Sequence, residues 1–191
     1  MYKLRENNLN TGSVSENKLY IYKYIINSAG VHLRKICKEL VLAMGDTQYH
    51  LSVLEKEGRI KSRRIGQHRH YYPVTILNEQ HELILAFLRQ ETTRDILIYL
   101  IEYPGSTQQD LAKFKDLSAP SIKWHMSKLI ESGLVIVRKE GKLVRYFIND
   151  SGSLTSCLKN YMPAIWNRLA NRFAERFIEI SLVRARVNNA K

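Results

Sequence analysis

Cysteine is scarce in this sequence of 191 residues, which contains only Cys37 and Cys157. One disulfide cannot hold together a chain of this length, so a disulfide framework is excluded and reduced thiols are expected. Long apolar runs are also lacking, because runs such as LILAFL at 83–88 are far shorter than a membrane span. The first ten residues, MYKLRENNLN, have no apolar core of signal-peptide length. We therefore expect a soluble, cytoplasmic protein.

Acidic residues are few, with 18 Asp and Glu against 30 Lys and Arg, which gives a formal net charge of +12. This balance favours polyanionic partners, with nucleic acid ahead of acidic membranes or acidic proteins. Motifs of catalysis are missing as well: there is no G-x-x-x-x-G-K-[ST] phosphate loop, and nothing suggests a nucleophile with its base or a paired-carboxylate site. We expect a globular protein that is not an enzyme.

One pattern occurs twice in the chain. The segment TQYHLSVLEKEGRI at 47–60 is followed 75 residues later by IKWHMSKLIESGLV at 122–135. The match extends without a gap over about 55 positions of the first repeat, from Tyr20 to Val74, and it places Gly30 over Gly105. A match of this length without gaps indicates an internal duplication.

Each repeat predicts three helices and a hairpin. The apolar segments 19–30 and 95–105 end at Gly or Pro-Gly, as first helices would. A second and a third helix follow, and the third is predicted to stop at Gly58 or Gly133. The β-rich segments after these glycines are broken at Gly66 and Gly141, which indicates hairpins. The side chains expected to face inward are Leu33, Ile36, Leu40, Thr47, Leu51 and Leu54 in the first repeat and Leu111, Phe114, Ile122, Met126 and Leu129 in the second.

Three helices followed by a hairpin form a helix-turn-helix with a wing. The predicted fold is therefore mainly α with small β-hairpin wings, organised as two tandem winged helix-turn-helix domains joined by a helix, plus a C-terminal amphipathic helix. The expected bounds are 16–75 for the first domain, 76–92 for the linking helix, 93–150 for the second domain and 151–186 for the C-terminal segment. The linking helix is expected to pack the two halves together through the side of Leu83 and Phe87.

The C-terminal segment carries an apolar stripe that must be buried on its own chain or on a partner. Pro163 is expected to start or kink its helix. The stripe consists of Ile165, Leu169, Phe173, Phe177 and Ile180. We expect it to form a homodimer contact.

The string GVHLRKICKELVLAMGDTQYHLSVLEKEGRIKSRRIGQHRHYYP at 30–73 resembles the archaeal tandem winged-helix transcriptional regulators, which are similar to the ArsR and MarR groups. The resemblance extends over roughly residues 18–150 and implies DNA binding. The first repeat departs from the pattern where Ala43 and Met44 replace the usual Ser or Thr cap of the third helix. The second repeat keeps Ser118 as the cap and Pro120 just inside the helix.

The third helices are the predicted readers of DNA, because such a helix fits the major groove and presents side chains to base edges. Gln48 could make a paired contact to adenine, and Lys123 could reach guanine or a phosphate. His50 and His125 share a repeat position and are expected to be structural or to face phosphates; metal binding there is disfavoured. The residues predicted to contact DNA from these helices are Asp46, Gln48, Tyr49, His50, Ser121, Lys123, Trp124 and His125. Tyr49 and Trp124 fit a stacking or sugar contact, or equally the edge of the core.

The wings carry the second set of predicted DNA contacts, to phosphates or into the minor groove. Residues 59–70 contain no acid, and a solvated hairpin does not need such one-sided charge. The second wing is more apolar, through Ile136, Val137, Leu143 and Val144, so the second repeat could instead be a scaffold. The predicted wing contacts are Arg59, Lys61, Arg63, Arg64, His68 and Arg69 in the first repeat and Arg138, Lys139, Lys142 and Arg145 in the second.

His68-x-His70, together with Cys37 and His32, raises the possibility of a metal-sensing site. Zinc sites need three or four ligands at constrained spacing, and the sequence has no CxxC or HExxH. We therefore expect no metal and no cofactor. The sequence predicts a regulator that binds specific double-stranded DNA at promoters and blocks or recruits the basal transcription machinery. The alternatives are a protein-interaction scaffold and a metal- or ligand-responsive repressor.

Overall fold

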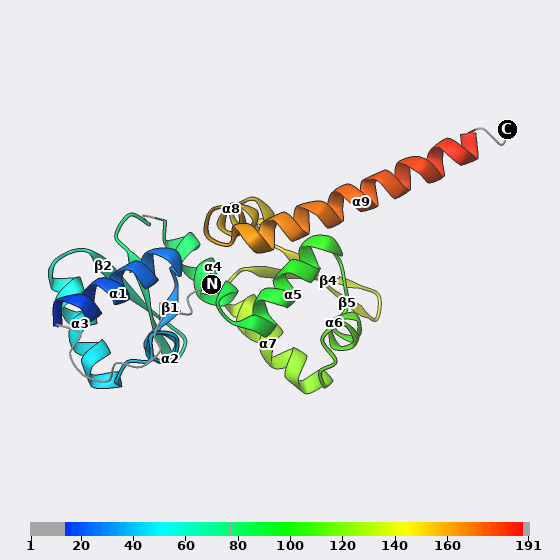
Figure 1. The fold of residues 1–191 in the computed structure, drawn as a ribbon. Coiled ribbons are helices and arrows are strands. Elements are labelled where there is room, and N and C mark those ends of the chain that lie inside the picture. Colours follow the sequence, from blue (N-terminus) through cyan, green and yellow to red (C-terminus); the bar gives the residue numbers. More distant parts are fainter. Residues whose placement is uncertain (1–13, 77, 189–191) are drawn as a thin grey trace. The chain divides into compact units, whose positions relative to one another are not determined.

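The structure is a computed structural model that describes the backbone of residues 14–76 and 78–188 and the side chains of residues 16–76, 78–176 and 178. The chain divides into two compact units, Met1–Glu82 and Leu83–Lys191, which we call unit one and unit two. Each unit is drawn in its own colour range in Figure 1.

Unit one contains three helices and a small antiparallel sheet. Helix α1 (Val14–Asn27) leads into strand β1 (Val31–His32), followed by α2 (Leu33–Leu40) and α3 (Met44–Lys56). Strands β2 (Ile60–Ile65) and β3 (His68–Pro73) then form a hairpin, and β1 pairs with β3, which gives the strand order β1-β3-β2. Helix α4 (Glu79–Leu88) starts at the end of unit one, and the division between the units falls within it.

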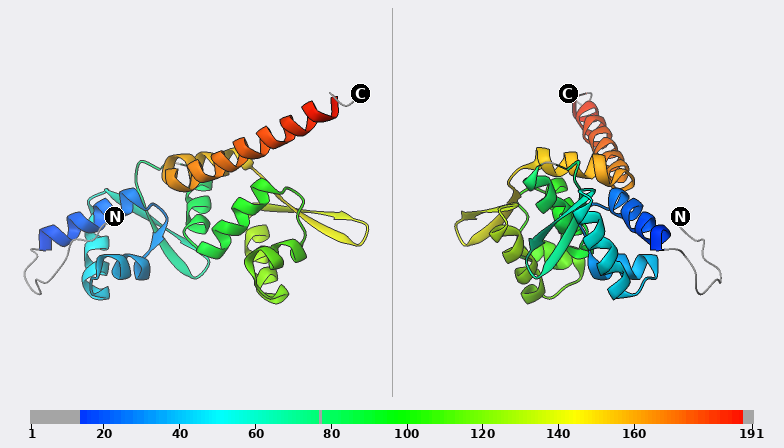
Figure 2. Two further views of the ribbon diagram at one scale, coloured as in Figure 1. Left: turned by 45° about the vertical axis from the view of Figure 1, so that its right-hand side comes forward. Right: turned by 90° about the vertical axis from the view of Figure 1, so that its left-hand side faces the viewer.

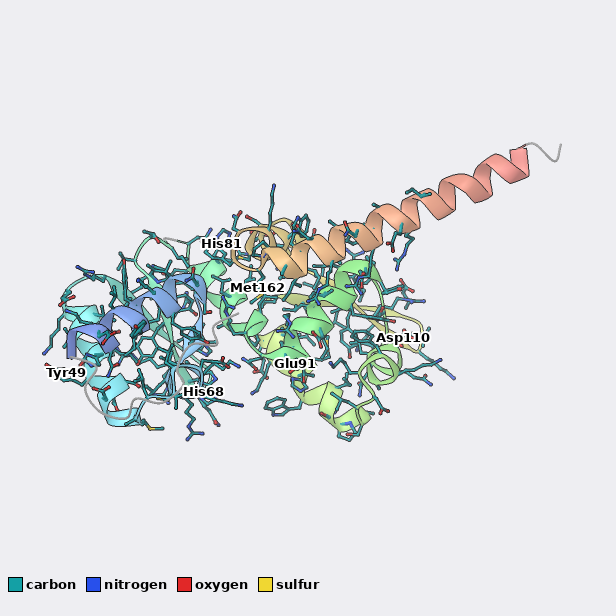
Figure 3. The ribbon with its side chains drawn as sticks, in the orientation of Figure 1. Tyr49, His68, His81, Glu91, Asp110 and Met162 are labelled. Atoms are coloured by element: carbon teal, nitrogen blue, oxygen red, sulfur yellow. The ribbon has the colours of Figure 1, made fainter. Side chains whose placement is uncertain are left out.

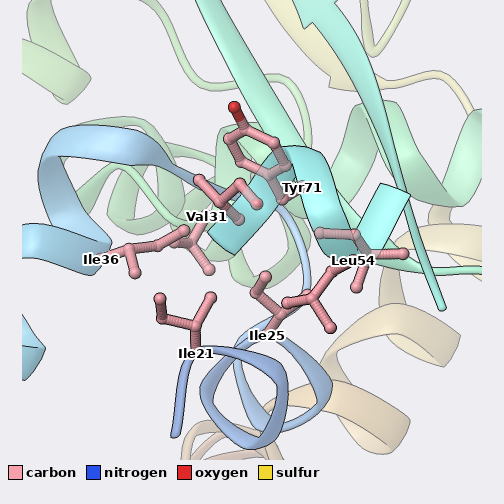
Figure 4. Packing of buried hydrophobic residues seen from close by; sticks show 8 residues of the cluster. Ile21, Ile25, Val31, Ile36, Leu54 and Tyr71 are labelled. Atoms are coloured by element: carbon pink, nitrogen blue, oxygen red, sulfur yellow. The ribbon is translucent and has the colours of Figure 1, made fainter. Parts of the chain in front are cut away.

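The core of unit one lies between α1, α3 and the sheet. Ile21 and Ile25 extend from α1 toward Leu54 of α3, and Tyr71 of β3 closes the cluster (Figure 4). Each of these side chains is buried. Full burial of one such aliphatic side chain stabilises the fold by about 1.5–3 kcal/mol, so this cluster contributes strongly to the packing of α3 on α1.

Unit two repeats this arrangement and adds two helices. Helices α5 (Glu91–Glu102), α6 (Gln108–Lys115) and α7 (Ala119–Glu131) precede the hairpin of β4 (Val135–Glu140) and β5 (Leu143–Ile148). A single bridge between Ser106 and Tyr146 replaces the β1–β3 pairing. The β4–β5 hairpin projects from the helices of its own unit (Figure 2). Helices α8 (Ser151–Tyr161) and α9 (Pro163–Asn188) follow.

The backbone confirms the predicted duplication. Left-handed conformations occur at Gly30, Gly58 and Gly66, and again 75 residues later at Gly105, Gly133 and Gly141. Two residues other than glycine share this property: Val41 with φ 54° and Asp116 with φ 51°, also 75 residues apart. The glycines after α3 and α7 are needed because a Cβ is disfavoured at the left-handed position that ends a helix. The two units therefore share one backbone path.

Most of the predicted buried stripes are confirmed. Thr47, Leu51 and Leu54 in α3 are buried, as are Ile122, Met126 and Leu129 in α7. Phe114 was expected to face inward, and that prediction is wrong, because 45% of this residue is exposed. Its ring stacks on Tyr99 with 4.4 Å between centroids, so it packs at the outer edge of α5 and α6.

The two third helices begin differently, as predicted. Ala43 precedes α3 and makes no side-chain cap. Ser118 precedes α7, and its hydroxyl accepts a hydrogen bond from the Ser121 backbone N–H at 3.4 Å. Pro120 lies in the first turn of α7, where its missing N–H costs nothing.

The C-terminal segment forms two helices, because Pro163 begins α9 after a break at Met162. Leu169 of the predicted apolar stripe is buried, whereas Phe173 is partly exposed. The side chains of Phe177 and Ile180 lie outside the described residues. Arg176 of α9 donates hydrogen bonds to the Glu102 carbonyl and the Tyr103 hydroxyl, which ties α9 to the end of α5. Within the described residues, no helix combines the length and apolar character needed to cross a bilayer.

Candidate nucleic-acid interface

The outer face of α3 is polar, and its exposed charged residue, Lys56, lies at the C-terminal end of the helix. Gln48, Tyr49 and Ser52 are exposed, and Tyr49 is labelled in Figure 3. The Ser52 hydroxyl donates to the Tyr49 carbonyl at 2.8 Å, so the amide of Gln48 and the phenol of Tyr49 are the groups left for an external partner. From Gln48 to Ser52, this face offers hydrogen-bond donors and acceptors instead of charge.

His50 does not lie on this face, so of the two expected roles, structural or facing phosphates, the structural one agrees with its burial. The side chain is 0% exposed, with Nε2 3.1 Å from Asp46 Oδ1. Asp46 also accepts a hydrogen bond from the Asn17 side-chain amide at 3.0 Å. His50 is three residues after Thr47 and four before Leu54, so it belongs to the buried stripe of α3. Asp46 thus links α3 to α1 through Asn17, and His50 contacts the same carboxylate from within α3.

The outer face of α7 differs from that of α3 in its charge. Lys123 and Trp124 are exposed at the positions equivalent to Gln48 and Tyr49. The ammonium nitrogen of Lys128 lies 3.5 Å from the centroid of the Trp124 ring, a cation–π contact. Ser121 is half-buried in the first turn, where its N–H bonds the Ser118 cap. Helix α7 therefore presents two lysines around one exposed indole.

His125 lies behind this face, between α7 and α5. Its Nδ1 is 3.4 Å from the Thr93 hydroxyl, and the ring is half-buried. Burial lowers the pKa of His125 below its ordinary value, and the nearby Lys128 lowers it further. The imidazole is therefore neutral at pH 7 and does not add to the charge of α7.

The hairpin of unit one, β2–β3, was expected to carry unbalanced positive charge, and this expectation is wrong for Lys61, Arg63 and Arg69. Lys61 Nζ lies 2.6 Å from the Glu82 carboxylate, which is nearly buried. Arg63 lies 3.5 Å from Glu82 and 3.3 Å from Glu79, both on α4. The acids that balance this wing come from outside the hairpin, so a local count of charges misses them.

Arg69 is balanced in the same way by α3. Its guanidinium lies 3.2 Å from Glu55 and donates to the Ser62 hydroxyl at 2.6 Å. Ser62 in turn donates to Glu55. Arg59 lies 3.5 Å from Glu57 at the end of α3. Of the five basic residues predicted on this wing, Arg64 alone has no carboxylate within ion-pair distance in the described part of the chain.

The hairpin of unit two, β4–β5, keeps more of its charge available. Lys139 and Lys142 are exposed and have no ion pair among the described residues. Arg138 lies over the Phe147 ring at 4.8 Å. Arg145 pairs with Glu140 and donates to the Gly105 carbonyl at 3.0 Å, so it holds the base of the hairpin. The wing with fewer basic residues in the sequence therefore presents more unpaired cations.

Three histidines meet beside β3, toward the turn end of the first hairpin. The ring of His32 lies 5.2 Å from that of exposed His68 and 6.0 Å from that of buried His70. His70 Nδ1 donates to the Gly30 carbonyl at 2.8 Å. Burial lowers the pKa of His32 and of His70, and the neighbouring His68 lowers both further. Among the described residues, no group of three His, Cys, Asp or Glu side chains is placed to hold a metal ion.

Sequence reasoning missed two kinds of residue at these surfaces. Lys128 was not proposed, although its spacing of four from Trp124 puts both on one side of a helix. The carboxylates of Glu55, Glu79 and Glu82 were not connected to the first wing, and no short-range pattern indicates those contacts.

Comparison with known families agrees with this geometry. Residues 15–83 match a family described as an N-terminal HTH domain, and residues 89–136 match one described as winged helix-turn-helix DNA-binding. The matched segments contain α1 to α3 with the first hairpin, and α5 to α7, respectively.

An uncharacterized HTH-type transcriptional regulator from Methanocaldococcus jannaschii is 32% identical over 138 residues, which are 72% of this chain and 34% of the relative. The chain thus spans about a third of that relative's length. Among solved structures, HlyU from Vibrio cholerae is 23% identical with a TM-score of 0.38, over 43% of this chain and 89% of HlyU. A hypothetical protein from Pyrobaculum spherical virus is 17% identical with a TM-score of 0.40, over 73% of this chain and 97% of that one. The two family matches and the duplicated fold show two winged helix-turn-helix domains in tandem, in a chain that is similar to an archaeal HTH-type transcriptional regulator.

Proposed function

We propose that this protein is a transcriptional regulator that binds specific double-stranded DNA at promoters through α3, α7 and the two hairpins. The observation that carries the proposal is the repetition of one DNA-binding fold with an exposed polar third helix in each copy. A net charge of +12 favours association with a polyanion, and two similar readers in one chain suit neighbouring half-sites. On promoter DNA, the protein would block or recruit the basal transcription machinery.

The test is binding of the purified full chain to a pool of genomic fragments at two salt concentrations, followed by sequencing of the retained fragments. A motif that remains enriched at the higher salt supports the proposal and gives the operator. Uniform retention that disappears with salt contradicts it, because charge alone would then account for binding.

A protein-interaction scaffold is the second candidate, and the hairpin of unit two favours it. Val137, Leu143 and Val144 are each exposed by more than a third, and such a strand surface suits a protein partner better than a phosphate backbone. Replacing Leu143 and Val144 by Thr separates the two functions. Unchanged DNA binding in that variant, together with loss of a co-purifying protein, would support the scaffold.

We also propose that α9 contacts a second copy of the chain. Helix α9 extends away from the rest of its own unit (Figure 1), and Phe173 and Ile178 leave part of its apolar surface uncovered. Sedimentation equilibrium of the full chain and of a Phe173→Glu, Ile178→Glu variant tests this contact. A dimer that the double substitution makes monomeric is expected, and a monomeric unmodified chain would contradict the proposal.

A further inference from the structure

The two recognition surfaces differ in charge although they occupy equivalent positions of one duplicated fold. We infer that the units bind DNA by different chemistry: unit one reads base edges through Gln48 and Tyr49, and unit two supplies most of the phosphate contacts through Lys123, Lys128, Lys139 and Lys142. The inference rests on the proposed function, and it places sequence preference in unit one and salt dependence in unit two.

Unit one has the groups for base reading, and α3 carries no exposed charged residue beside them until Lys56, seven residues after Tyr49. The Gln48 amide carries both a donor and an acceptor, the pair that recognises adenine in the major groove. Tyr49, 58% exposed, adds a ring face for a thymine methyl or a sugar and a hydroxyl for a further hydrogen bond. The Asp46 carboxylate of the same helix contacts His50 and Asn17, so it is not a free negative charge that would repel DNA.

The first hairpin does not compensate for the low charge of α3. Lys61 and Arg63 are held by Glu82, and Arg69 by Glu55, at 2.6, 3.5 and 3.2 Å. A phosphate that recruits one of these cations must compete with a carboxylate already in contact, so less free energy is released than with an unpaired cation. Arg64 is the wing cation of unit one that remains available.

Unit two has the opposite character. Lys123 and Lys128 flank Trp124 on α7, and Lys139 and Lys142 lie on the projecting hairpin. No carboxylate of the described residues lies within ion-pair distance of these four ammonium groups. Lysine is a compact point charge, and the contacts that such side chains make to phosphates carry no sequence information. This surface therefore favours binding to duplex DNA without preference for a particular sequence.

The experiment measures dissociation constants of the full chain for two duplexes, the one selected from the genomic pool and a scrambled duplex of the same composition, across a series of salt concentrations. Gln48→Ala is expected to reduce the ratio between the two affinities by about 5- to 150-fold with little change in salt slope. A variant with the four lysines replaced by Ala is expected to keep the ratio, and to lose about 0.9 of logarithmic slope for each lysine that neutralises a phosphate.

The duplication supplies a matched pair of controls, because Gln48 and Lys123 are equivalent. Lys123→Gln should lower the salt slope and preserve the affinity ratio, whereas Gln48→Lys should raise the slope and abolish the ratio. Thermal unfolding of each variant verifies that it is folded. The inference would be wrong if Gln48→Ala left the affinity ratio unchanged, or if the four-lysine variant lost it. Either result would leave the proposal of DNA binding intact. Failure of the unmodified chain to prefer its selected duplex would instead remove the proposed function.

Discussion

Helices α3 and α7 have the same length and the same backbone surroundings, yet one presents Gln48 and Tyr49 where the other presents Lys123 and Trp124. The inner faces have changed little, since Leu51 and Leu54 are matched by Met126 and Leu129, all buried. The difference shows that packing constrains the buried face of each helix and not the exposed face. Buried positions must keep volume and apolar character, whereas exposed positions on the same helix are free to change their chemistry.

The two hairpins also differ, in this case in how many of their basic side chains form ion pairs. In unit one, Glu55, Glu79 and Glu82 neutralise three basic side chains of the β2–β3 hairpin. In unit two, the one acid of the β4–β5 hairpin, Glu140, pairs with Arg145 and leaves Lys139 and Lys142 unpaired among the described residues. The number of basic residues is therefore a poor guide to the charge that a surface offers a ligand.

The largest expected effect concerns the two cores. Ile21→Ala and Ile96→Ala remove equivalent side chains that are both 0% exposed, and each should lower stability by about 2–5 kcal/mol. If the units fold independently, amide hydrogen exchange should accelerate only in the unit that carries the substitution. Ile26→Ala, at an exposed position of α1, is the control and should have little effect. Equal loss of protection in both units would mean that they unfold together.

The next effect concerns Glu82, which balances the first hairpin. Glu82→Gln should lower the stability of unit one by about 1 kcal/mol, a value reduced because its partners are about one-third exposed. The same change frees Lys61 and leaves Arg63 paired with Glu79 alone, so it should steepen the salt dependence of DNA binding. Glu140→Gln frees only Arg145 and should have a smaller effect. A Glu82→Gln variant with an unchanged salt slope would show that the two cations do not reach DNA.

A smaller effect on stability is expected at the left-handed residues that follow α2 and α6, which are Val41 and Asp116. Val41 is 88% exposed and β-branched, so Val41→Gly should stabilise unit one by about 0.5–1 kcal/mol after the entropy cost of glycine is deducted. Asp116→Gly, at the equivalent turn, should change stability much less, because Asp tolerates this conformation. Urea unfolding curves of both variants measure the difference. Destabilisation by Val41→Gly would mean that the turn is not strained.

The smallest effect concerns the helix caps. Ala43→Ser gives α3 the cap it lacks and should add about 0.5–1 kcal/mol, and Ser118→Ala should remove about as much from α7. Both changes are read from the same urea curves. If Ala43→Ser leaves stability unchanged, the backbone before α3 does not permit a serine cap.

Much of the fold could be predicted because it depends on local periodicity. The spacing of apolar residues in α3 and α7 repeats at 75 residues, as do the glycines that follow the first and third helices and form the hairpin turn, so the same elements are indicated twice. Phe114 was misplaced because an apolar residue at a helical spacing can pack on a neighbouring ring at the surface as well as in the core.

The candidate interface was harder to predict, for two physical reasons. His50 follows the inward spacing of Thr47 and Leu54, but its polarity suggested an outward position; in the structure its Nε2 lies 3.1 Å from the partly exposed Asp46 carboxylate. The partners of Lys61, Arg63 and Arg69 lie on other elements, and only tertiary structure brings α3 and α4 against the hairpin.

The equal spacing of the left-handed turns has a consequence for protein engineering. Residues 44–56 and 119–131 form helices of 13 residues that each lead into a left-handed glycine two residues later. One segment can therefore replace the other without a change in loop length. Chains with two copies of α3 or two copies of α7 are accessible by exchange of a single cassette, and each would carry one binding chemistry in duplicate.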